Sequence, residues 1–372
     1  MKKRFKVGEL CYYCCFYMYM STFYICSMSN FSSFPISQLI YKLIAILVMI
    51  PLLILPFCHK QKLKAIIMKI IIIGIVSYST YVNSSWFLLV TILFILSSVQ
   101  VDFKRMIKLD LIIKALCLII IGGAAFLGLI ESSYTQRFGN LINNSLGFRH
   151  TNILGLFIMM FFFEIFYFYG RRLSYIQLIS CYLFIYFFSG SRSVLVSMVV
   201  FCFFYSVLVI REKRKWRPRK YYSLFLICSL LSMIAVKYYH PNNIFFRLDI
   251  FLSKRIYLSS LAYNYYGFSI IGQDTKYLLT SLNNLYGFQS IYIDNAYVST
   301  LINNGILILA GYFVLYKKSI QKAIKNDDIK MLCIMMSLLI YGLMENKIFD
   351  IGTNVFLVYL MTKTKKKGVL YE

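Results

Sequence analysis

The chain has little charge for its length and very few acidic residues. Only 15% of its 372 residues are charged, and 14 Asp and Glu stand against 40 Lys and Arg. A chain in which 60% of the residues are hydrophobic has too little polar surface to cover a water-soluble globule. The composition therefore excludes an ordinary soluble domain and indicates an integral membrane protein.

The chain also lacks the short motifs that hold nucleotides and catalytic zinc. It contains no GxxxxGK(S/T), no GxGxxG and no HExxH, so P-loop, dinucleotide and zinc-protease chemistry have no support. Its ten cysteines lie mostly within apolar runs, where buried free thiols explain them without a disulfide framework. Cys11 and Cys14 have a CxxC spacing but stand without a second pair, which argues against a metal or redox site. We expect no metal and no cofactor.

The net charge of +26 raises the question of a nucleic-acid partner. A nucleic-acid module keeps its Lys and Arg on one soluble face. Here they form short clusters between apolar runs, which is the pattern of membrane topology. We therefore expect no nucleic acid among the partners.

Long apolar runs predict an all-α, polytopic integral membrane protein. A bilayer core of roughly 30 Å needs about 20 apolar residues per helix, and about twelve runs meet this demand, so residues 1–372 are expected to form a single membrane domain. The run after Lys2, Lys3 and Arg4 lacks a small-residue cleavage pattern and is interpreted as a first membrane helix rather than a signal peptide. The predicted spans are 10–28, 35–57, 65–82, 85–101, 109–130, 153–170, 173–190, 193–210, 221–239, 296–316, 331–345 and 349–362.

The basic residues predict the orientation of these spans. With the N-terminus inside, the inner segments hold 28 of the 40 Lys and Arg and the outer segments hold eight. Because short cytoplasmic loops are enriched in Lys and Arg, both termini are expected in the cytoplasm of a cell that carries this protein in its plasma membrane. The longest connection, 240–294, is then an extracytoplasmic loop.

Outer arginines run against this charge bias and are candidates for a local purpose. Arg192 follows a very short turn and falls in the first turn of a predicted helix, where backbone N–H groups and the helix dipole already favour a phosphate. A similar helix start follows Arg149, with Thr151 or Asn152 expected as its N-cap, and a third lies at Asp294. Helix capping alone is the alternative explanation of these polar residues.

Within the long loop, residues 244–263 predict one amphipathic helix. Arg247 and Lys254 share a face, while Phe245, Leu248 and Leu252 share another. Such a helix either lies flat at the membrane surface with its cations toward headgroups or packs over the mouth of the bundle.

Glu164 is a lone carboxylate within an apolar run. An ionisable side chain at membrane depth is a functional candidate by default. Helical spacing places Arg171 and Arg172 near it, so an internal ion pair with one of them is expected.

Several strings in the second half of the chain form an ordered series. They are SLGFRHTNILG at 145–155, GSRS at 190–193, LSKRIYL around Arg255, IIGQ at 270–273, IDNAYVSTLINNGI at 293–306, and Glu345 before Asn354. The series, over roughly residues 137–360, resembles the Wzy-type polysaccharide polymerases, which share a superfamily with the O-antigen ligases.

The resemblance implies transfer of a growing glycan from undecaprenyl pyrophosphate to the sugar end of another lipid-linked repeat unit, outside the plasma membrane. No nucleotide sugar is needed, because pyrophosphate-lipid is the leaving group. Expected partners are lipid-linked oligosaccharide repeat units and membrane lipid, with flippase and chain-length regulator proteins as further candidates. Arg192 and Arg255, supported by Arg247 and Arg149, are the candidate pyrophosphate ligands. The candidate proton acceptors are His150, which is favoured for its pKa near neutrality, Asp294 and Glu345.

Three alternatives stay open at this point. A ligase of the same superfamily passes the glycan to a different acceptor, and the sequence does not separate it from a polymerase. A flippase-type transporter of lipid-linked oligosaccharide is expected to have internal repeats and interrupted helices with polar residues at midplane, and the sequence shows neither clearly. A membrane scaffold subunit without chemistry leaves the outer arginines incidental.

Overall fold

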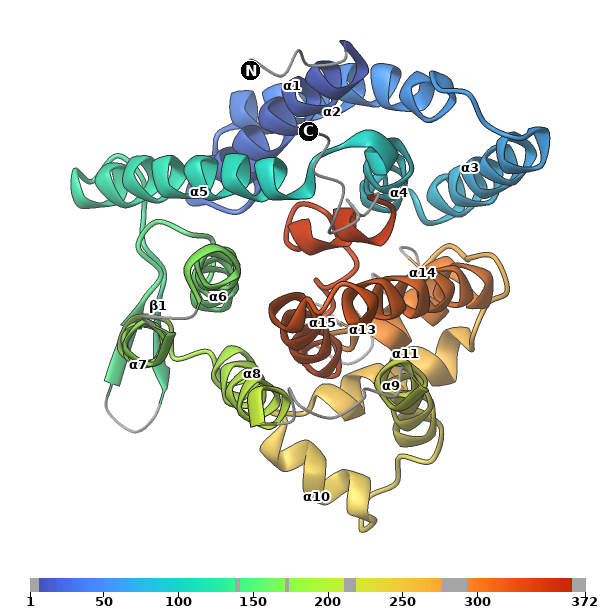
Figure 1. Cartoon of the computed structure of the whole chain (residues 1–372). Coiled ribbons are helices and arrows are strands. Elements are labelled where there is room, and N and C mark those ends of the chain that lie inside the picture. The colour runs from blue at the N-terminus through green and yellow to red at the C-terminus, as the bar shows by residue number, and fades with distance from the viewer. Residues whose placement is uncertain (1–6, 138–140, 171–173, 211–218, 276–292, 363–372) are drawn as a thin grey trace. The chain divides into compact units, whose positions relative to one another are not determined.

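The computed structural model describes residues 7–137, 141–170, 174–210, 219–275 and 293–362, and most of them are helical (Figure 1). The chain divides into two compact units. Unit 1 consists of Met1–Lys62, Leu93–Ser206 and Ile351–Glu372, and unit 2 consists of Leu63–Ile92 and Val207–Asp350.

Unit 1 is built on long apolar helices and one hairpin. Helix α1 packs against α2 and α5, and α6 packs against α5 and α7. The hairpin pairs β1 with β2 antiparallel, with Tyr134 opposite Asn144 and Arg137 opposite Leu141. Its elements are α1 (Val7–Thr22), η1 (Phe23–Ser27), η2 (Asn30–Ser33), α2 (Pro35–Ile54), η3 (Leu55–Phe57), the end of α4 (Phe87–Ser97), η4 (Ser98–Gln100), α5 (Phe103–Phe126), β1 (Tyr134–Arg137), β2 (Leu141–Asn144), α6 (Thr151–Tyr169), α7 (Ser174–Phe184), η5 (Ile185–Ser189), most of α8 (Arg192–Ile210) and η7 (Val355–Leu360).

Unit 2 gathers the polar loop region and the later helices. Helix α9 packs against α11, α13, α14 and α15, and η6 packs against α3 and α14. Its elements are α3 (Leu63–Asn83), the start of α4, the end of α8, α9 (Arg219–Lys237), α10 (Ile244–Phe251), α11 (Arg255–Tyr266), α13 (Ala296–Ser299), η6 (Thr300–Asn304), α14 (Ile306–Lys325) and α15 (Ile329–Tyr341).

Among the described residues, four helical segments are long and apolar enough to cross a membrane: Pro35–Phe57, Leu63–Asn83, Phe103–Phe126 and Thr151–Tyr169. The first two are mostly not covered by the rest of the protein: only 28% and 17%, respectively, of their most apolar 18-residue stretch is buried. Large apolar side chains such as Ile36, Leu43 and Ile50 on α2 are exposed instead. Such faces suit a lipid environment, because soluble proteins rarely expose large contiguous apolar patches. The helical membrane-protein class expected from the sequence is thus confirmed at this coarse level.

The structure differs from the predicted spans in three places. The hairpin of 134–144 was not expected in an all-α fold. Residues 349–362 form turns and one short 3₁₀ helix, Val355–Leu360, instead of a continuous helix. The predicted span 296–316 is interrupted at Gly305, whose φ of 94° ends η6 before α14 begins. A residue with a side chain rarely adopts this φ, so glycine permits the break.

A buried charged group joins α5 to α6 inside unit 1. Lys114 lies 2.6 Å from Asp110 and also contacts Glu164, while the Tyr24 hydroxyl donates to Asp110 at 2.9 Å. The ion pair expected for Glu164 is present, but its observed partner is Lys114 on a neighbouring helix, because that amine reaches it directly through the packed interior. Arg171 and Arg172 lie outside the described residues.

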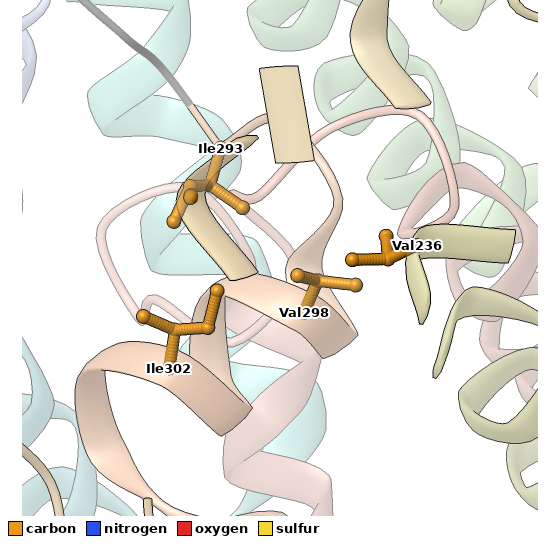
Figure 2. Packing of buried hydrophobic residues seen from close by; sticks show 5 residues of the cluster. Val236, Ile293, Val298 and Ile302 are labelled. Carbon is orange, nitrogen blue, oxygen red and sulfur yellow. The ribbon is translucent and has the colours of Figure 1, made fainter. Parts of the chain in front are cut away.

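A small apolar cluster lies within unit 2 (Figure 2). Val236, Ala262 and Ile293 pack with Val298 and Ile302, which lie on α13 and η6. Tyr263, Tyr266 and Phe268 cover this cluster as half-buried neighbours. Burial of such side chains stabilises each by about 1.5–3 kcal/mol. The cluster therefore holds α11, which begins at Arg255, against the segment that carries Asp294.

Candidate functional site

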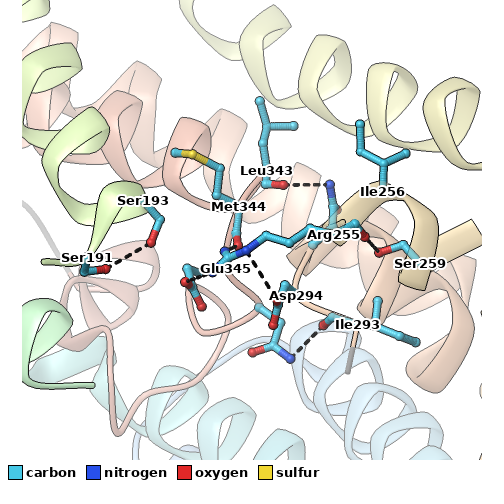
Figure 3. A network of polar contacts seen from close by, with 12 residues as sticks. Ser191, Ser193, Arg255, Ile256, Ser259, Ile293, Asp294, Leu343, Met344 and Glu345 are labelled. Atoms are coloured by element: carbon cyan, nitrogen blue, oxygen red, sulfur yellow. Dashed lines mark hydrogen bonds and ion pairs between the residues drawn. The ribbon is translucent and has the colours of Figure 1, made fainter. Parts of the chain in front are cut away.

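Three charged side chains meet in unit 2 (Figure 3). Arg255 Nε lies 3.3 Å from Asp294 Oδ2, and Arg255 Nη2 lies 2.8 Å from Glu345 Oε1. Arg255 Nη1 also donates to the main-chain oxygen of Met344. The three charged side chains keep 18%, 28% and 12% of their surface exposed, respectively, so the cluster is reachable but only partly hydrated. The structure thus brings together three of the seven predicted site residues, and we call them the Arg255 cluster.

Asp249 fixes the beginning of the helix that carries Arg255. Its carboxylate accepts hydrogen bonds from the backbone N–H of Ile256 at 2.6 Å and of Tyr257 at 3.2 Å, and from the Tyr239 hydroxyl at 3.1 Å. The side chain is almost fully buried. Since the first N–H groups of a helix have no partner within it, this carboxylate caps α11 from a neighbouring helix and sets the direction in which Arg255 points.

The prediction of a single amphipathic helix over 244–263 is wrong. The helix stops after Phe251 and restarts at Arg255, and Ser253 and Lys254 between them have φ values of 59° and 64°. Two consecutive residues in the left-handed region cannot continue a right-handed helix. The break carries the chain around Asp249, so that Arg247 and Lys254 no longer share one helical face.

Two asparagines hold the backbone beside the carboxylates. Asn295 caps α13 by accepting from the N–H groups of Tyr297 and Val298, both at 3.0 Å, and donates to Leu343 O at 3.1 Å. Asn346 donates to Ile293 O at 2.8 Å. These bonds tie the residues next to Asp294 to the turn that contains Glu345.

The surroundings of Asp294 make its carboxyl group a weaker acid than an ordinary aspartic acid. Burial raises the pKa of Asp294 to about 6, helped by the nearby Glu345 charge and opposed by Arg255 and Lys347. Burial also disfavours charged Arg255, but Glu345 and Asp294 outweigh it and raise the pKa of the guanidinium, which stays protonated. Among the described residues, none donates a hydrogen bond to Asp294 Oδ1. At neutral pH Asp294 is therefore mostly ionised, and it has an oxygen with which to accept a proton.

Three other predicted residues belong to unit 1. Arg149 and His150 are exposed and immediately precede α6. His150 Nδ1 accepts from the N–H of Asn152 at 3.1 Å, which makes His150 the N-cap of the helix. The expected caps, Thr151 and Asn152, are the first helical residues instead. The imidazole meets the capping demand because its unprotonated nitrogen is an acceptor, as a Ser or Asp oxygen would be.

Arg192 begins α8, as the sequence predicts, and its side chain is exposed. The turn before it depends on Gly190, whose φ is 59° and where a Cβ would lie 2.4 Å from Asn143 Oδ1. The Ser189 hydroxyl donates to Thr151 O at 2.7 Å. This bond places the starts of α6 and α8 next to each other within unit 1, so Arg149, His150 and Arg192 belong to neighbouring helix starts.

Arg247, the seventh predicted residue, is exposed on α10 of unit 2. It lies two residues before the capping Asp249. Lys276, a further cation of the long loop, lies outside the described residues.

Sequence reasoning missed Asp249 and Asn346. Asp249 occupies the apolar face of the expected helix, in step with Phe245, Leu248 and Leu252, and a carboxylate on that face was the available signal. Asn346 had no comparable signal, because its role depends on a turn that brings 342–350 to the segment before α13. Among the described residues, no group of three or more His, Cys, Asp and Glu side chains is arranged to hold a metal ion.

In comparisons with known proteins, no protein family, curated protein or solved structure matches this chain.

Proposed function

We propose that this protein is a membrane polysaccharide polymerase that joins undecaprenyl-pyrophosphate-linked repeat units on the outer face of the plasma membrane. The proposal rests on the resemblance of its ordered motifs to the Wzy-type polymerases. The observation that carries it is the Arg255 cluster, in which an arginine contacts two carboxylates and one of these carboxylates has a pKa of about 6. A cation for a leaving pyrophosphate and a base for an acceptor hydroxyl are the two groups this reaction requires.

In the proposed step, the acceptor hydroxyl oxygen attacks the anomeric carbon of the donor sugar. The bond from that carbon to the pyrophosphate oxygen breaks, and undecaprenyl pyrophosphate leaves with the electron pair. Asp294 Oδ1 takes the hydroxyl proton. Protonation weakens the attraction of Asp294 for Arg255, so the guanidinium Nε becomes available to the pyrophosphate charge as it develops. Glu345 keeps its contact and holds Arg255 in place.

The remaining predicted residues take supporting roles in this proposal. Arg247 is an exposed cation of the same unit as the Arg255 cluster, suited to contact the diphosphate before reaction. Arg149 and Arg192 are exposed cations at the helix starts of unit 1 and stay candidate phosphate ligands on the resemblance alone. His150, the base favoured from the sequence, already uses Nδ1 in capping α6, so we assign the proton to Asp294 instead.

The proposed topology keeps both termini in the cytoplasm and 240–294 outside. An irregular segment crosses a bilayer only where protein surrounds it, and residues 351–360 are all buried. This burial supports a crossing by turns and a short 3₁₀ helix in place of the α-helix expected over 349–362.

A chain-length test in cells probes the proposal. Arg255→Ala should abolish long polysaccharide while single repeat units persist, because both the leaving-group cation and the positions of Asp294 and Glu345 are lost. Lys318→Ala is the matched control, since Lys318 is an exposed cation on α14 of the same unit. A full-length ladder from the Arg255 variant would refute the site.

One observation favours a transporter of lipid-linked oligosaccharide as a second candidate. The helix interrupted at Gly305 ends with Asn303 and Asn304, and polar residues at broken helices are typical of transporter binding sites. Liposomes that hold purified lipid-linked repeat units separate the two: a transporter moves single units across the bilayer and leaves their length unchanged, while a polymerase lengthens them.

A further inference from the structure

Unit 2 contains a cavity of 220 Å³ whose polar lining is mostly uncharged. Asn83 of α3, Asn303 and Asn304 of η6, and Asn346 of the 342–350 turn all line it. Amides and hydroxyls predominate over the two charged residues in the lining, Lys347 and Asp350. The volume holds several water molecules and is below the roughly 300–1,000 Å³ of sites for drug-sized ligands. The cavity therefore suits a small polar ligand.

The cavity depends on the interrupted helix. At Gly305 the backbone passes so close to the loop before it that a Cβ would lie 2.4 Å from Ile270 O. Asn83 Nδ2 donates to Asn303 O at 3.2 Å and to Asn304 Oδ1 at 2.7 Å. The Thr275 hydroxyl donates to Asn303 Oδ1 at 3.0 Å. The bond to Asn303 O satisfies a backbone group at the break, and the two bonds to side-chain oxygens hold Asn303 and Asn304 in fixed positions at the cavity wall.

Some polar atoms of the lining remain available for a ligand. Within the part of the chain that the structure describes, no residue accepts from Asn304 Nδ2, none donates to Asn346 Oδ1, and the Ser85 hydroxyl has no hydrogen-bond partner. Together they offer an amide donor, a carbonyl acceptor and a hydroxyl that does both. This is the set that recognises the hydroxyl groups of a neutral sugar.

Aromatic rings complete the lining. Tyr312 and Phe349 stack with their ring centroids 4.5 Å apart, and both residues line the cavity with Phe87. Aromatic rings offer a large apolar surface, against which the C–H face of a sugar ring packs while its hydroxyls meet the amides.

The cavity adjoins the Arg255 cluster through two short segments of chain. Asn346 lines the cavity and follows Glu345, and its amide bonds to the carbonyl oxygen of Ile293, which precedes Asp294. A ligand in the cavity is therefore next to the backbone that positions both carboxylates.

We propose that this asparagine-lined cavity binds one neutral sugar ring of the acceptor repeat unit and presents its hydroxyl to Asp294. The identification of this sugar as part of the acceptor rests on the proposed polymerase function. The binding of a sugar ring itself rests on the cavity alone.

Tryptophan fluorescence tests the binding without any reaction. The chain has two tryptophans, Trp86 and Trp216, and Trp86 lies between two cavity-lining residues, Ser85 and Phe87. In a Trp216→Phe background, the probe is the oligosaccharide released by mild acid from the lipid-linked repeat units of the source cells. We expect a saturable change in Trp86 emission. Loss of one hydrogen bond in Ser85→Ala should weaken binding roughly 2- to 10-fold.

Asn304→Ala should weaken binding at least as much, and its thermal melt shows whether the fold is kept. Asn264→Ala is the matched control, because Asn264 is an exposed asparagine on α11 that does not line the cavity. Its affinity should equal that of the unmodified cavity. Absence of saturable binding, or equal affinity in Ser85→Ala, Asn304→Ala and the control, overturns the inference.

The two proposals fail in different ways. If repeat units are elongated but sugar binding does not depend on the cavity residues, the acceptor cavity is refuted and the polymerase proposal stands. If sugar binding depends on the cavity residues but repeat units are not elongated, the polymerase proposal is refuted and the sugar-binding site stands.

Discussion

Replacing Glu345 by Gln should shift the pH at which the protein becomes active. Asp294 has a pKa of about 6, and the negative charge of Glu345 is one of the groups that raise it. As the base, Asp294 must be ionised, so the rate should fall tenfold per pH unit below about 6. Removing a like charge favours the ionised form. The acidic limb should therefore move to lower pH in Glu345→Gln.

The size of the shift follows from the geometry of the cluster. Both carboxylates contact one guanidinium, at 3.3 and 2.8 Å, which puts their charges on the order of 6 Å apart. At that distance two like charges repel by about 0.7 kcal/mol in water and about 2.8 kcal/mol at an effective dielectric constant of 20. Since 1.36 kcal/mol corresponds to one pKa unit, the limb should move down by about 0.5 to 2 units.

The assay is the pH dependence of kcat/KM for elongation of lipid-linked repeat units in proteoliposomes, measured for the unmodified protein, Glu345→Gln and Lys318→Ala. The unmodified protein and Lys318→Ala should both reach half of their maximal value near pH 6. An acidic limb that stays in place in Glu345→Gln, or moves upward, would refute the assignment of Asp294 as the base.

Three further predictions concern residues that shape helix starts in the two units. Asp249→Ala removes the cap of α11, so it should cost about 0.5–2 kcal/mol of stability and lower the rate of elongation. Asp249→Asn keeps one acceptor oxygen and should partly restore both. Chemical unfolding measures the stability and the proteoliposome assay measures elongation. His150→Ala should lose about 1 kcal/mol of helix capping but keep elongation within about tenfold, whereas loss of a general base costs 10²–10⁴-fold; a larger loss of elongation in His150→Ala returns the base to His150. Gly190→Ala combines a left-handed φ with a contact to Asn143 and should lower the Tm, whereas Gly74→Ala, which has open space around its Cβ position, should not.

The sequence predicts the helices well where an apolar run decides the structure. Runs such as 35–57 and 153–170 become α2 with η3 and α6, because a backbone in an apolar environment must satisfy its own hydrogen bonds. The break at Gly305 and the break before Arg255 escape the same reasoning. Both depend on polar partners, the distant Asn83 for the first and the nearby Asp249 for the second, and hydropathy does not predict either contact.

The candidate site was predictable in its residue types but not in its pairing. Arg255, Asp294 and Glu345 stand out as charges in a chain that has few acids. Their meeting depends on Asn295 and Asn346, which fold the 342–350 turn back to the start of α13. Likewise, Lys114 contacts Glu164 from fifty residues away, a contact that depends on tertiary packing and that helical spacing does not predict.

The most direct measurement of the central claim is elongation by the purified protein in proteoliposomes, with lipid-linked repeat units as the only substrate and no nucleotide sugar present. We expect a ladder of lengthened lipid-linked glycans from the unmodified protein, and a rate reduced about 10²- to 10⁴-fold in Asp294→Asn. Repeat units that stay single with the unmodified protein, or a ladder that forms equally fast with Asp294→Asn, would contradict it.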